Sequence, residues 1–274
     1  MAGTVSEESL PAAVEPTKRR IPRPPYRGRF LVVYAFLGAI VAAGVAALVF
    51  LLVRGSGSEH PWSAWVPSGT VDVQVEQIAN HVAGQYRLPT GDELLAVEAT
   101  PLRVQDTPVA GVVVRRPAGA VTGQNPIEVF SSAGTIGYVL CGLGPNCSIA
   151  SGKPSAARHR LVRRQALELA LYTFRYVKDA KAIVAFMPPP KGQQANEALL
   201  LRRSDLEPLL ERPLASTLSP KAPQANTIKN GEARRIDQAT MGNLFRYQYQ
   251  QLQDGSAALI LDDPRIPQSP STAQ

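Results

Sequence analysis

The amino-acid sequence predicts an α+β domain, with a mixed or antiparallel sheet and one long packed helix, behind a single N-terminal transmembrane α-helix. Two observations support this prediction. One uninterrupted apolar run lies near the N-terminus, and the roughly 200 residues after it combine helical and strand patterns that do not alternate strictly. A chain of 274 residues with 45% hydrophobic content is long enough to bury a core without metals or disulfides as substitutes.

The transmembrane prediction rests on residues 30–53, a run of 24 residues with no charged residue and no Asn, Gln, Ser or Thr. As an α-helix the run would be roughly 36 Å long, which is enough to cross the hydrocarbon core of a bilayer. The alternative, a buried helix of a soluble protein, rarely exceeds about 14 wholly apolar residues. We interpret the run as an uncleaved signal anchor, because it is too long for a signal peptide and the residues after it, Arg54-Gly55-Ser56-Gly57, contain no A-x-A cleavage pattern.

Charges on either side of the apolar run predict its orientation. Only Arg54 follows it closely, whereas six basic residues precede it. Because positive charge stays on the cytoplasmic side, we expect a cytoplasmic N-terminus, an extracytoplasmic C-terminal domain and a location in the cell membrane. The six residues are Lys18, Arg19, Arg20, Arg23, Arg27 and Arg29.

The composition divides the chain into five segments. Trp62 and Trp65 lie in a connector rich in Gly, Ser and Pro, where their rings either sit among lipid headgroups or pack on the folded domain. A folded domain follows, which we expect to be one unit rather than two divided near residue 190. The predicted segments are a disordered basic tail (1–29), the membrane span (30–53), a linker (54–69), the α+β domain (70–262) and a disordered C-terminus (263–274).

Periodicity predicts the elements of the outer domain. Apolar residues at helical spacing predict helices over 71–86 and 156–177, and Ser204 with Glu207 resembles a capping box that begins another. Two hairpins are expected, one through residues 131–134 and one through a type I′ turn at Asp254-Gly255, whereas 219–230 has loop composition. Strands are predicted at 93–100, 109–115, 127–130, 135–141, 182–187, 198–202, 245–253 and 256–261.

Cys141 and Cys147 are the only cysteines, and the five residues between them include two glycines and a proline. A loop of this composition can bring the sulfurs together, and an extracytoplasmic location permits oxidation, so we predict a disulfide. A redox pair would more usually have two intervening residues, and a zinc site would need two more ligands, which the three histidines do not supply at a recognised spacing. Unpaired thiols remain the other alternative.

Four arginines crowd the first half of the long predicted helix: Arg158, Arg160, Arg163 and Arg164. Guanidinium groups match phosphate groups in pairs, and cations here oppose the helix dipole, a cost that an anionic partner would relieve. The cluster is therefore a candidate site for a phosphate-bearing polymer or lipid headgroup. The alternative is a solvated face or internal ion pairs, particularly because Arg160 and Arg164 continue the line of the apolar stripe through Leu167 and Leu171.

We find no catalytic signature in the sequence. G-x-S-x-G, S-x-x-K, the P-loop, the dinucleotide fingerprint, H-E-x-x-H and the EF-hand loop do not occur. No cofactor or metal site is expected. His159 could serve as a base for a cysteine nucleophile, but a cysteine and a histidine a dozen residues apart are common by chance.

Partners are limited by charge and location. The tail holds six basic and three acidic residues, which leaves +4 of the net charge of +7 for the rest of the chain. We expect no nucleic-acid partner, because such proteins need a dense basic face and the domain would lie outside the cell. The lipid bilayer is one expected partner. Ala35, Ala39 and Ala43 recur at every fourth residue of the span, which would suit a homo-oligomer or another membrane protein, although alanine is common enough there for chance alignment.

The sequence therefore predicts a membrane-anchored cell-envelope protein whose outer domain binds another protein or an anionic envelope component without catalysis. The main alternative is an envelope hydrolase whose active residues are too scattered for motifs to reveal. A deep cleft with converging carboxylates, Ser or His would favour the enzyme, and a shallow apolar or arginine-lined face would favour the binding domain. A third possibility is a subunit that acts mainly through its transmembrane helix.

Overall fold

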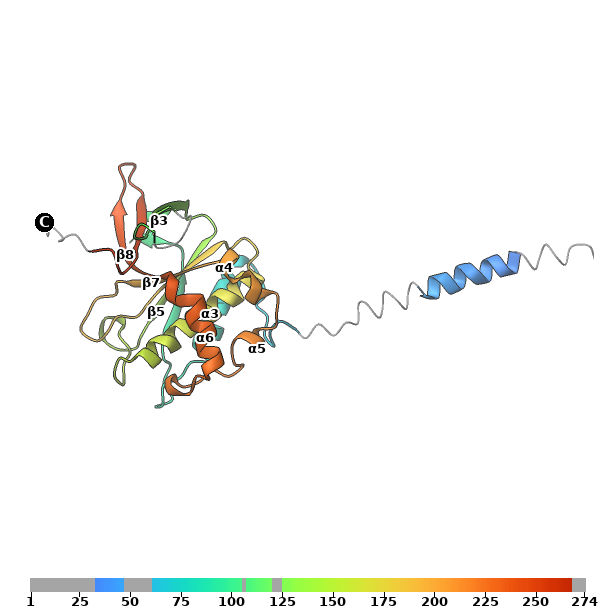
Figure 1. Ribbon diagram of the computed structural model, residues 1–274, viewed down its shortest axis with the longest axis horizontal. Helices are drawn as coiled ribbons and strands as arrows, with labels where there is room; N and C mark the ends of the chain where they lie inside the picture. Colours follow the sequence, from blue (N-terminus) through green and yellow to red (C-terminus); the bar gives the residue numbers. More distant parts are fainter. Residues whose placement is uncertain (1–32, 47–60, 105–106, 120–124, 268–274) are drawn as a thin grey trace, which may run out of the picture. The chain divides into compact units, whose positions relative to one another are not determined.

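The structure, a computed structural model, describes residues 33–46, 61–104, 107–119 and 125–267. The chain separates into two units, Met1–Glu59 and His60–Gln274. Residues 33–46 of the first unit are helical (Figure 1). None of the helices in these described ranges is long and apolar enough to span a membrane. The transmembrane helix over 30–53 stays a prediction, and residues 1–29, 30–32 and 47–53 lie outside the described residues.

The second unit combines one large sheet with several helices, which confirms the predicted α+β class (Figure 1). The helices are α2 (Val71–Ala83), α3 (Ala156–Tyr176), α4 (Arg203–Leu210), α5 (Leu214–Thr217) and α6 (Asn230–Thr240), with short 3-10 turns η1 (Pro145–Cys147), η2 (Ala225–Thr227) and η3 (Met241–Asn243). The strands are β1 (Ala96–Thr100), β2 (Arg103–Val104), β3 (Thr107–Arg115), β4 (Ile127–Ser131), β5 (Thr135–Cys141), β6 (Ala182–Phe186), β7 (Glu197–Arg202), β8 (Leu244–Gln251) and β9 (Ala257–Asp262).

The strands form one mixed sheet in the order β1-β5-β6-β7-β8-β9-β3-β2, with β4 paired to β3. The pairs β5–β6 and β3–β9 are parallel, and the other pairs are antiparallel. Because β3 pairs with β9, an early strand and the last strand of the domain are neighbours in the sheet, and residues on both sides of position 190 build it.

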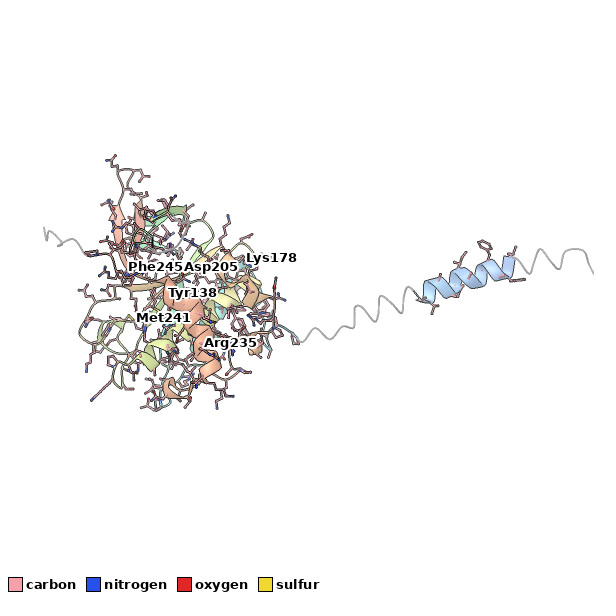
Figure 2. The ribbon with its side chains drawn as sticks, viewed as in Figure 1. Tyr138, Lys178, Asp205, Arg235, Met241 and Phe245 are labelled. Atoms are coloured by element: carbon pink, nitrogen blue, oxygen red, sulfur yellow. A yellow bond between two sulfur atoms is a disulfide. The ribbon has the colours of Figure 1, made fainter. Side chains whose placement is uncertain are left out.

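The sheet curls around an apolar cluster on one of its faces. Val184 of β6 and Leu259 of β9 belong to the same buried cluster, although β7 and β8 separate their strands in the sheet. Strands β1 and β2 follow one another along the chain and are joined by Pro101 and Leu102. In the sheet they stand at opposite ends of the strand order. The sheet therefore bends back toward its beginning and encloses this cluster. Phe245, which is labelled in Figure 2, belongs to the cluster and is fully buried.

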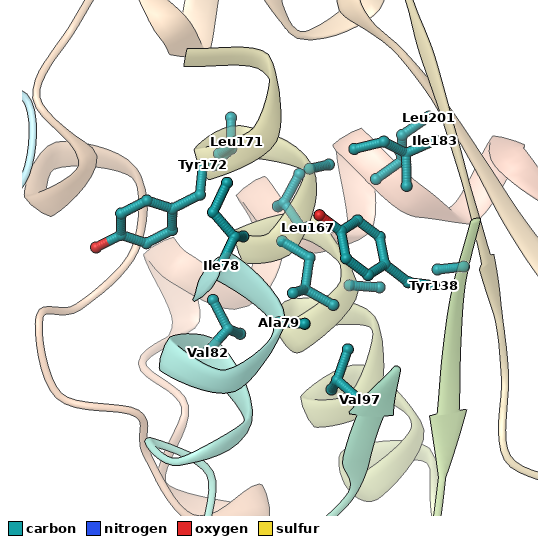
Figure 3. Packing of buried hydrophobic residues seen from close by; sticks show 14 of the residues in the cluster. Ile78, Ala79, Val82, Val97, Tyr138, Leu167, Leu171, Tyr172, Ile183 and Leu201 are labelled. Carbon is teal, nitrogen blue, oxygen red and sulfur yellow. The ribbon is translucent and has the colours of Figure 1, made fainter. Parts of the chain in front are cut away.

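The opposite face of the sheet packs against the helices. Residues 161–174 of α3 are all buried, which makes α3 the centre of the domain. Leu167 of α3 lies in the same cluster as Ile78 of α2 and Ile183 of β6 (Figure 3). The hydroxyl groups of Tyr138 on β5 and Thr173 on α3 are 2.7 Å apart, so the buried phenol has a hydrogen-bond partner. The prediction of a long packed helix over 156–177 is confirmed.

The two tryptophans of the predicted linker pack on the folded domain. Trp62 is 7% exposed and lies edge-on to Tyr172 and Tyr176 of α3. Trp65 stacks on His81 of α2 with ring centroids 3.9 Å apart. The folded unit thus begins before Thr70, and the interpretation in which these rings pack on the domain holds.

Several local predictions were wrong. Residues 131–134 turn the chain, but β4 pairs with β3 and β5 pairs with β1 and β6, so no hairpin forms there. The hairpin of β8 and β9 exists, yet only Gly255 of its turn has positive φ, which excludes type I′. Ser204 lies inside α4 and donates to Asp205, so it is not the cap.

The predicted disorder after residue 262 was also wrong for the first five residues. Asp263 is 8% exposed and accepts hydrogen bonds from the backbone amide and guanidinium of Arg265. Arg246 of β8 donates to the carbonyl oxygen of Ile266. Residues 268–274 lie outside the described residues.

Candidate functional site

The N-terminus of α3 borders a cleft that collects polar side chains from three parts of the chain. Ser155 caps the helix, and its hydroxyl oxygen accepts a hydrogen bond from the amide of Arg158. One turn further, His159 Nε2 lies 3.0 Å from Glu197 Oε2 at the start of β7. Both side chains are partly exposed, at 40% and 37%. The cap and the start of β7 therefore place a histidine–carboxylate pair at the surface.

This cleft, here called the α3 cleft, has a volume of about 290 Å³. Its lining includes the first turn of α3 with Ser155, Arg158 and His159, and the Pro188–Pro190 segment that follows β6, with Lys191 next to it. The prolines cannot continue the ladder of β6, so the chain leaves the sheet at this point. The result is a pocket with apolar walls and a few polar groups, the usual form of a ligand site.

The charge lining the α3 cleft is mostly positive. Among the residues that the structure describes, Arg158 and Lys191 are its permanent cations and Glu197 is its one carboxylate. Within the described ranges, neither cation lies in an ion pair, whereas Glu197 is bonded to His159. The arrangement leaves two cations available to an anion that enters the cleft.

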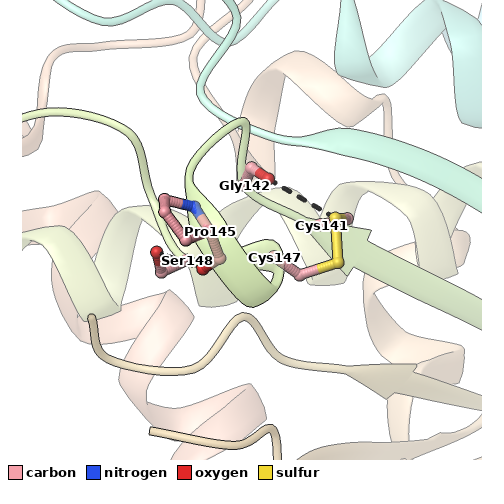
Figure 4. Close-up of a disulfide and its surroundings, with 5 residues drawn as sticks. All are labelled: Cys141, Gly142, Pro145, Cys147 and Ser148. Atoms are coloured by element: carbon pink, nitrogen blue, oxygen red, sulfur yellow. Dashed lines mark hydrogen bonds between the residues drawn. A yellow bond between two sulfur atoms is a disulfide. The ribbon is translucent and has the colours of Figure 1, made fainter. Parts of the chain in front are cut away.

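Cys141 and Cys147 form a disulfide, as predicted, with Cα atoms 4.4 Å apart (Figure 4). Asn146 and Cys147 both have left-handed backbones, and the amide of Gly142 donates to the carbonyl oxygen of Cys147. A Cβ atom on Gly142 would collide with the backbone of Ser148, so the tight reversal requires glycine. Because both sulfurs are bonded to each other, neither is a nucleophile for His159.

The arginine cluster divides in the structure. Arg160 and Arg163 both pair with Asp237 of α6, at 2.9 and 2.7 Å. Arg164 is fully buried between Glu232 of α6, at 2.7 Å, and a glutamate of its own helix. Arg163 is 3% exposed. These contacts are the internal ion pairs of the alternative interpretation, and only Arg158 of the four lines a cleft.

The buried charges around Arg164 affect one another. Burial raises the pKa of Glu168, which accepts hydrogen bonds from Tyr86 and Arg164. Burial also acts on Glu232, but hydrogen bonds from Ser219 and pairing with Arg164 outweigh it and lower its pKa. Glu232 is therefore the carboxylate that balances Arg164, and Glu168 is the group that more readily holds a proton.

No metal centre is present in the described part of the chain, where no three His, Cys, Asp or Glu side chains lie close enough together to hold an ion. His81 of α2 stacks on Trp65 and is far along the chain from His159, which lines the α3 cleft. His60 lies outside the described residues.

A second cleft of about 310 Å³, here called the aromatic cleft, lies near the disulfide. The ring of Phe186 on β6 lies 4.9 Å from that of Tyr247 and 6.4 Å from that of Tyr249, both on β8. Burial raises the pKa of Tyr249 to about 12, so its phenol is neutral at physiological pH. Met187 and Pro189 line both this cleft and the α3 cleft.

Sequence reasoning missed Glu197 and Lys191 as site residues, because each is a single charged residue in a segment without a motif. The one available signal was the Pro188–Pro190 stop after a strand, which marks a rigid surface segment near a strand end. Comparisons with protein-family models, with curated proteins and with solved structures gave no match for this chain.

Proposed function

We propose that this chain is a membrane-anchored cell-envelope protein whose outer domain binds an anionic envelope component in the α3 cleft, without catalysis. The observation that supports this function best is the pair of cations Arg158 and Lys191, which have no ion-pair partner among the described residues. They line a cleft whose one carboxylate from the described residues, Glu197, is already bonded to His159. A guanidinium and an ammonium group that line one cleft can both contact a single phosphate or carboxylate group.

The membrane part of the proposal rests on sequence and on the disulfide. Residues 30–53 are apolar throughout and follow six basic residues, the arrangement of a span with a cytoplasmic N-terminus. The Cys141–Cys147 disulfide suits an oxidising compartment, since cytosolic thiols are kept reduced. Both arguments favour an extracytoplasmic domain.

Reporter fusions test this topology. A reporter that is active only outside the cytoplasm should work when fused after Gln274 and should fail when fused at Met1. The opposite result would overturn the orientation, and activity of neither fusion together with recovery of the chain in the soluble fraction would overturn the anchor.

Binding of inorganic pyrophosphate tests the α3 cleft. The full-length protein in a zwitterionic detergent is titrated by calorimetry at low salt. We expect binding that weakens steeply as salt rises and that falls at least fivefold in Lys191→Gln and in Arg158→Gln. Lys178→Gln is the matched control, because Lys178 is an exposed lysine outside the cleft. Equal affinity of Lys191→Gln and Lys178→Gln would contradict the proposed site.

The main alternative is an envelope hydrolase, and one observation favours it. Ser155, His159 and Glu197 all line the α3 cleft, and a histidine oriented by a carboxylate can serve as a general base for a serine. Against it, the Ser155 hydroxyl already caps α3. Hydrolysis of a chromogenic ester by the wild type that is lost in both Ser155→Ala and His159→Gln would establish the enzyme instead of the binding protein.

A further inference from the structure

A groove of about 700 Å³ runs between α2 and β1. It shares Glu98, Thr100 and Pro101 with the aromatic cleft and no residue with the α3 cleft. One side is formed by Val71, Val75 and Ala79, which follow one another at four-residue spacing along α2. The other side is formed by β1 from Val97 to Thr100 and by Thr135 and Ile136 at the start of β5. We call this feature the α2–β1 groove.

One edge of β1 is open to new pairing. The strand pairs with β5 from Ala96↔Cys141 to Thr100↔Gly137, and no other described strand pairs with it. In an antiparallel pair, every second residue of an edge strand directs its N–H and C=O groups away from its neighbour. Such an edge can accept a further strand, and an extended peptide that adds there gains backbone hydrogen bonds along its length.

The charge of the α2–β1 groove is opposite to that of the molecule. Three carboxylates line it, from Asp72 and Glu76 on α2 and Glu98 on β1, and no lysine, arginine or histidine of the described part of the chain does. All three are exposed, and among the ion pairs of the described residues none includes them. The chain as a whole has a net charge of +7. A basic ligand would therefore be attracted to this groove, and a second copy of this chain would be repelled by the overall charge.

We propose that the α2–β1 groove binds an extended, basic peptide segment of a partner protein, which adds as a strand to the free edge of β1. Each part of the groove recognises one property of that segment. The edge of β1 pairs with its backbone, the apolar line of α2 contacts its apolar side chains, and the carboxylates of α2 and β1 attract its lysine or arginine side chains. This site is independent of the anion site in the α3 cleft.

A pair of synthetic peptides tests the proposal. The probes are fluorescein-labelled, acetylated hexapeptides of alternating Lys and Val or of alternating Glu and Val, titrated with the full-length protein in zwitterionic detergent. We expect the lysine peptide to bind with an affinity that falls as salt rises, and the glutamate peptide to bind at least tenfold more weakly. Glu76→Gln should lower the affinity for the lysine peptide at least threefold. Glu211→Gln, the same change at an exposed site outside the groove, should leave it unchanged.

Strand addition is tested separately from charge. Methylation of alternate backbone nitrogens of the lysine peptide preserves its charge and removes hydrogen-bond donors, so we expect at least a tenfold loss of affinity in one of the two alternating registers. Amides of residues 96–100 should also exchange more slowly with solvent when the peptide is bound. Three results would each overturn the proposal. The two methylated peptides could bind with the same affinity as each other, or the glutamate peptide could bind as tightly as the lysine peptide. Glu76→Gln could also change the affinity for the lysine peptide no more than Glu211→Gln does.

Discussion

Arg164 of α3 and Glu232 of α6 form an ion pair in the interior of the domain, with Nε and Oε1 2.7 Å apart and side chains only 0% and 2% exposed. Glu232 also accepts hydrogen bonds from the amide and hydroxyl of Ser219, at 3.0 and 2.5 Å. The pair thus connects the long central helix to α6 and to the loop before it. Because each charge is buried, each depends on the other for compensation.

Removing the charge of Glu232 should destabilise the domain. In Glu232→Gln the buried guanidinium of Arg164 loses its main carboxylate, and we expect the free energy of unfolding to fall by about 3 kcal/mol. Urea denaturation of the full-length protein measures it. The exposed Glu211→Gln should change stability by less than about 0.5 kcal/mol. Equal stabilities of the two variants would show that the pair contributes nothing.

Asp237 should make stability depend on acid pH. Hydrogen bonds from Arg160, and then from Arg163, lower the pKa of Asp237 below that of an unfolded aspartate. Its contribution is therefore fully present above the unfolded pKa, near about 4, and is lost as the pH falls through the lower folded pKa. We expect the stability difference between wild type and Asp237→Asn to shrink on acidification from pH 6 to pH 3, in urea titrations at each pH. A difference that stays constant or grows would contradict this assignment.

The disulfide should be detectable by mass and should contribute modestly to stability. Alkylation without reduction should leave Cys141 and Cys147 unmodified, with the chain two mass units lighter than the reduced form. The double replacement by serine should still fold, because closing so short a loop stabilises by only about 2 kcal/mol. Uptake of two alkyl groups without reduction would show free thiols.

Trp62 should stabilise the domain from outside its predicted boundary. The indole is buried against Tyr172 and Tyr176, so Trp62→Ala should lower the free energy of unfolding by about 3 kcal/mol. Val66→Ala, four residues later at a side chain 59% exposed, should have almost no effect. Fluorescence of the remaining Trp65 can follow both transitions. A Trp62→Ala variant as stable as Val66→Ala would mean that the chain before Thr70 is only a linker.

The sequence was a good guide where apolar periodicity was strong. The α3 helix and the β8–β9 hairpin have clear apolar patterns, and both were located within a few residues. Helix α6 escaped prediction because its buried residues are Glu232, Ile236 and Thr240, only one of which is apolar. A helix that buries a charge and a hydroxyl has no apolar stripe to recognise.

Missing α6 also explains the incomplete account of the arginines. From sequence, Arg160, Arg163 and Arg164 had no evident acidic partners, because Asp237 and Glu232 lie about 70 residues away on that helix. The pairing of β3 with β9 could not be predicted from the sequence either, since it joins strands that lie far apart along the chain. The local pattern of apolar and turn residues indicates which residues are buried and where the chain turns, but it does not indicate which distant segments come into contact.

The segment after β6 connects two sites that would otherwise be separate. Met187 and Pro189 belong to the walls of both the α3 cleft and the aromatic cleft. A ligand that shifts this rigid proline segment in one cleft changes the shape of the other, so occupancy of the two would be thermodynamically coupled. Such coupling is reciprocal: if a ligand of the aromatic cleft alters the affinity for an anion beside α3 by some factor, the anion alters the affinity for that ligand by the same factor.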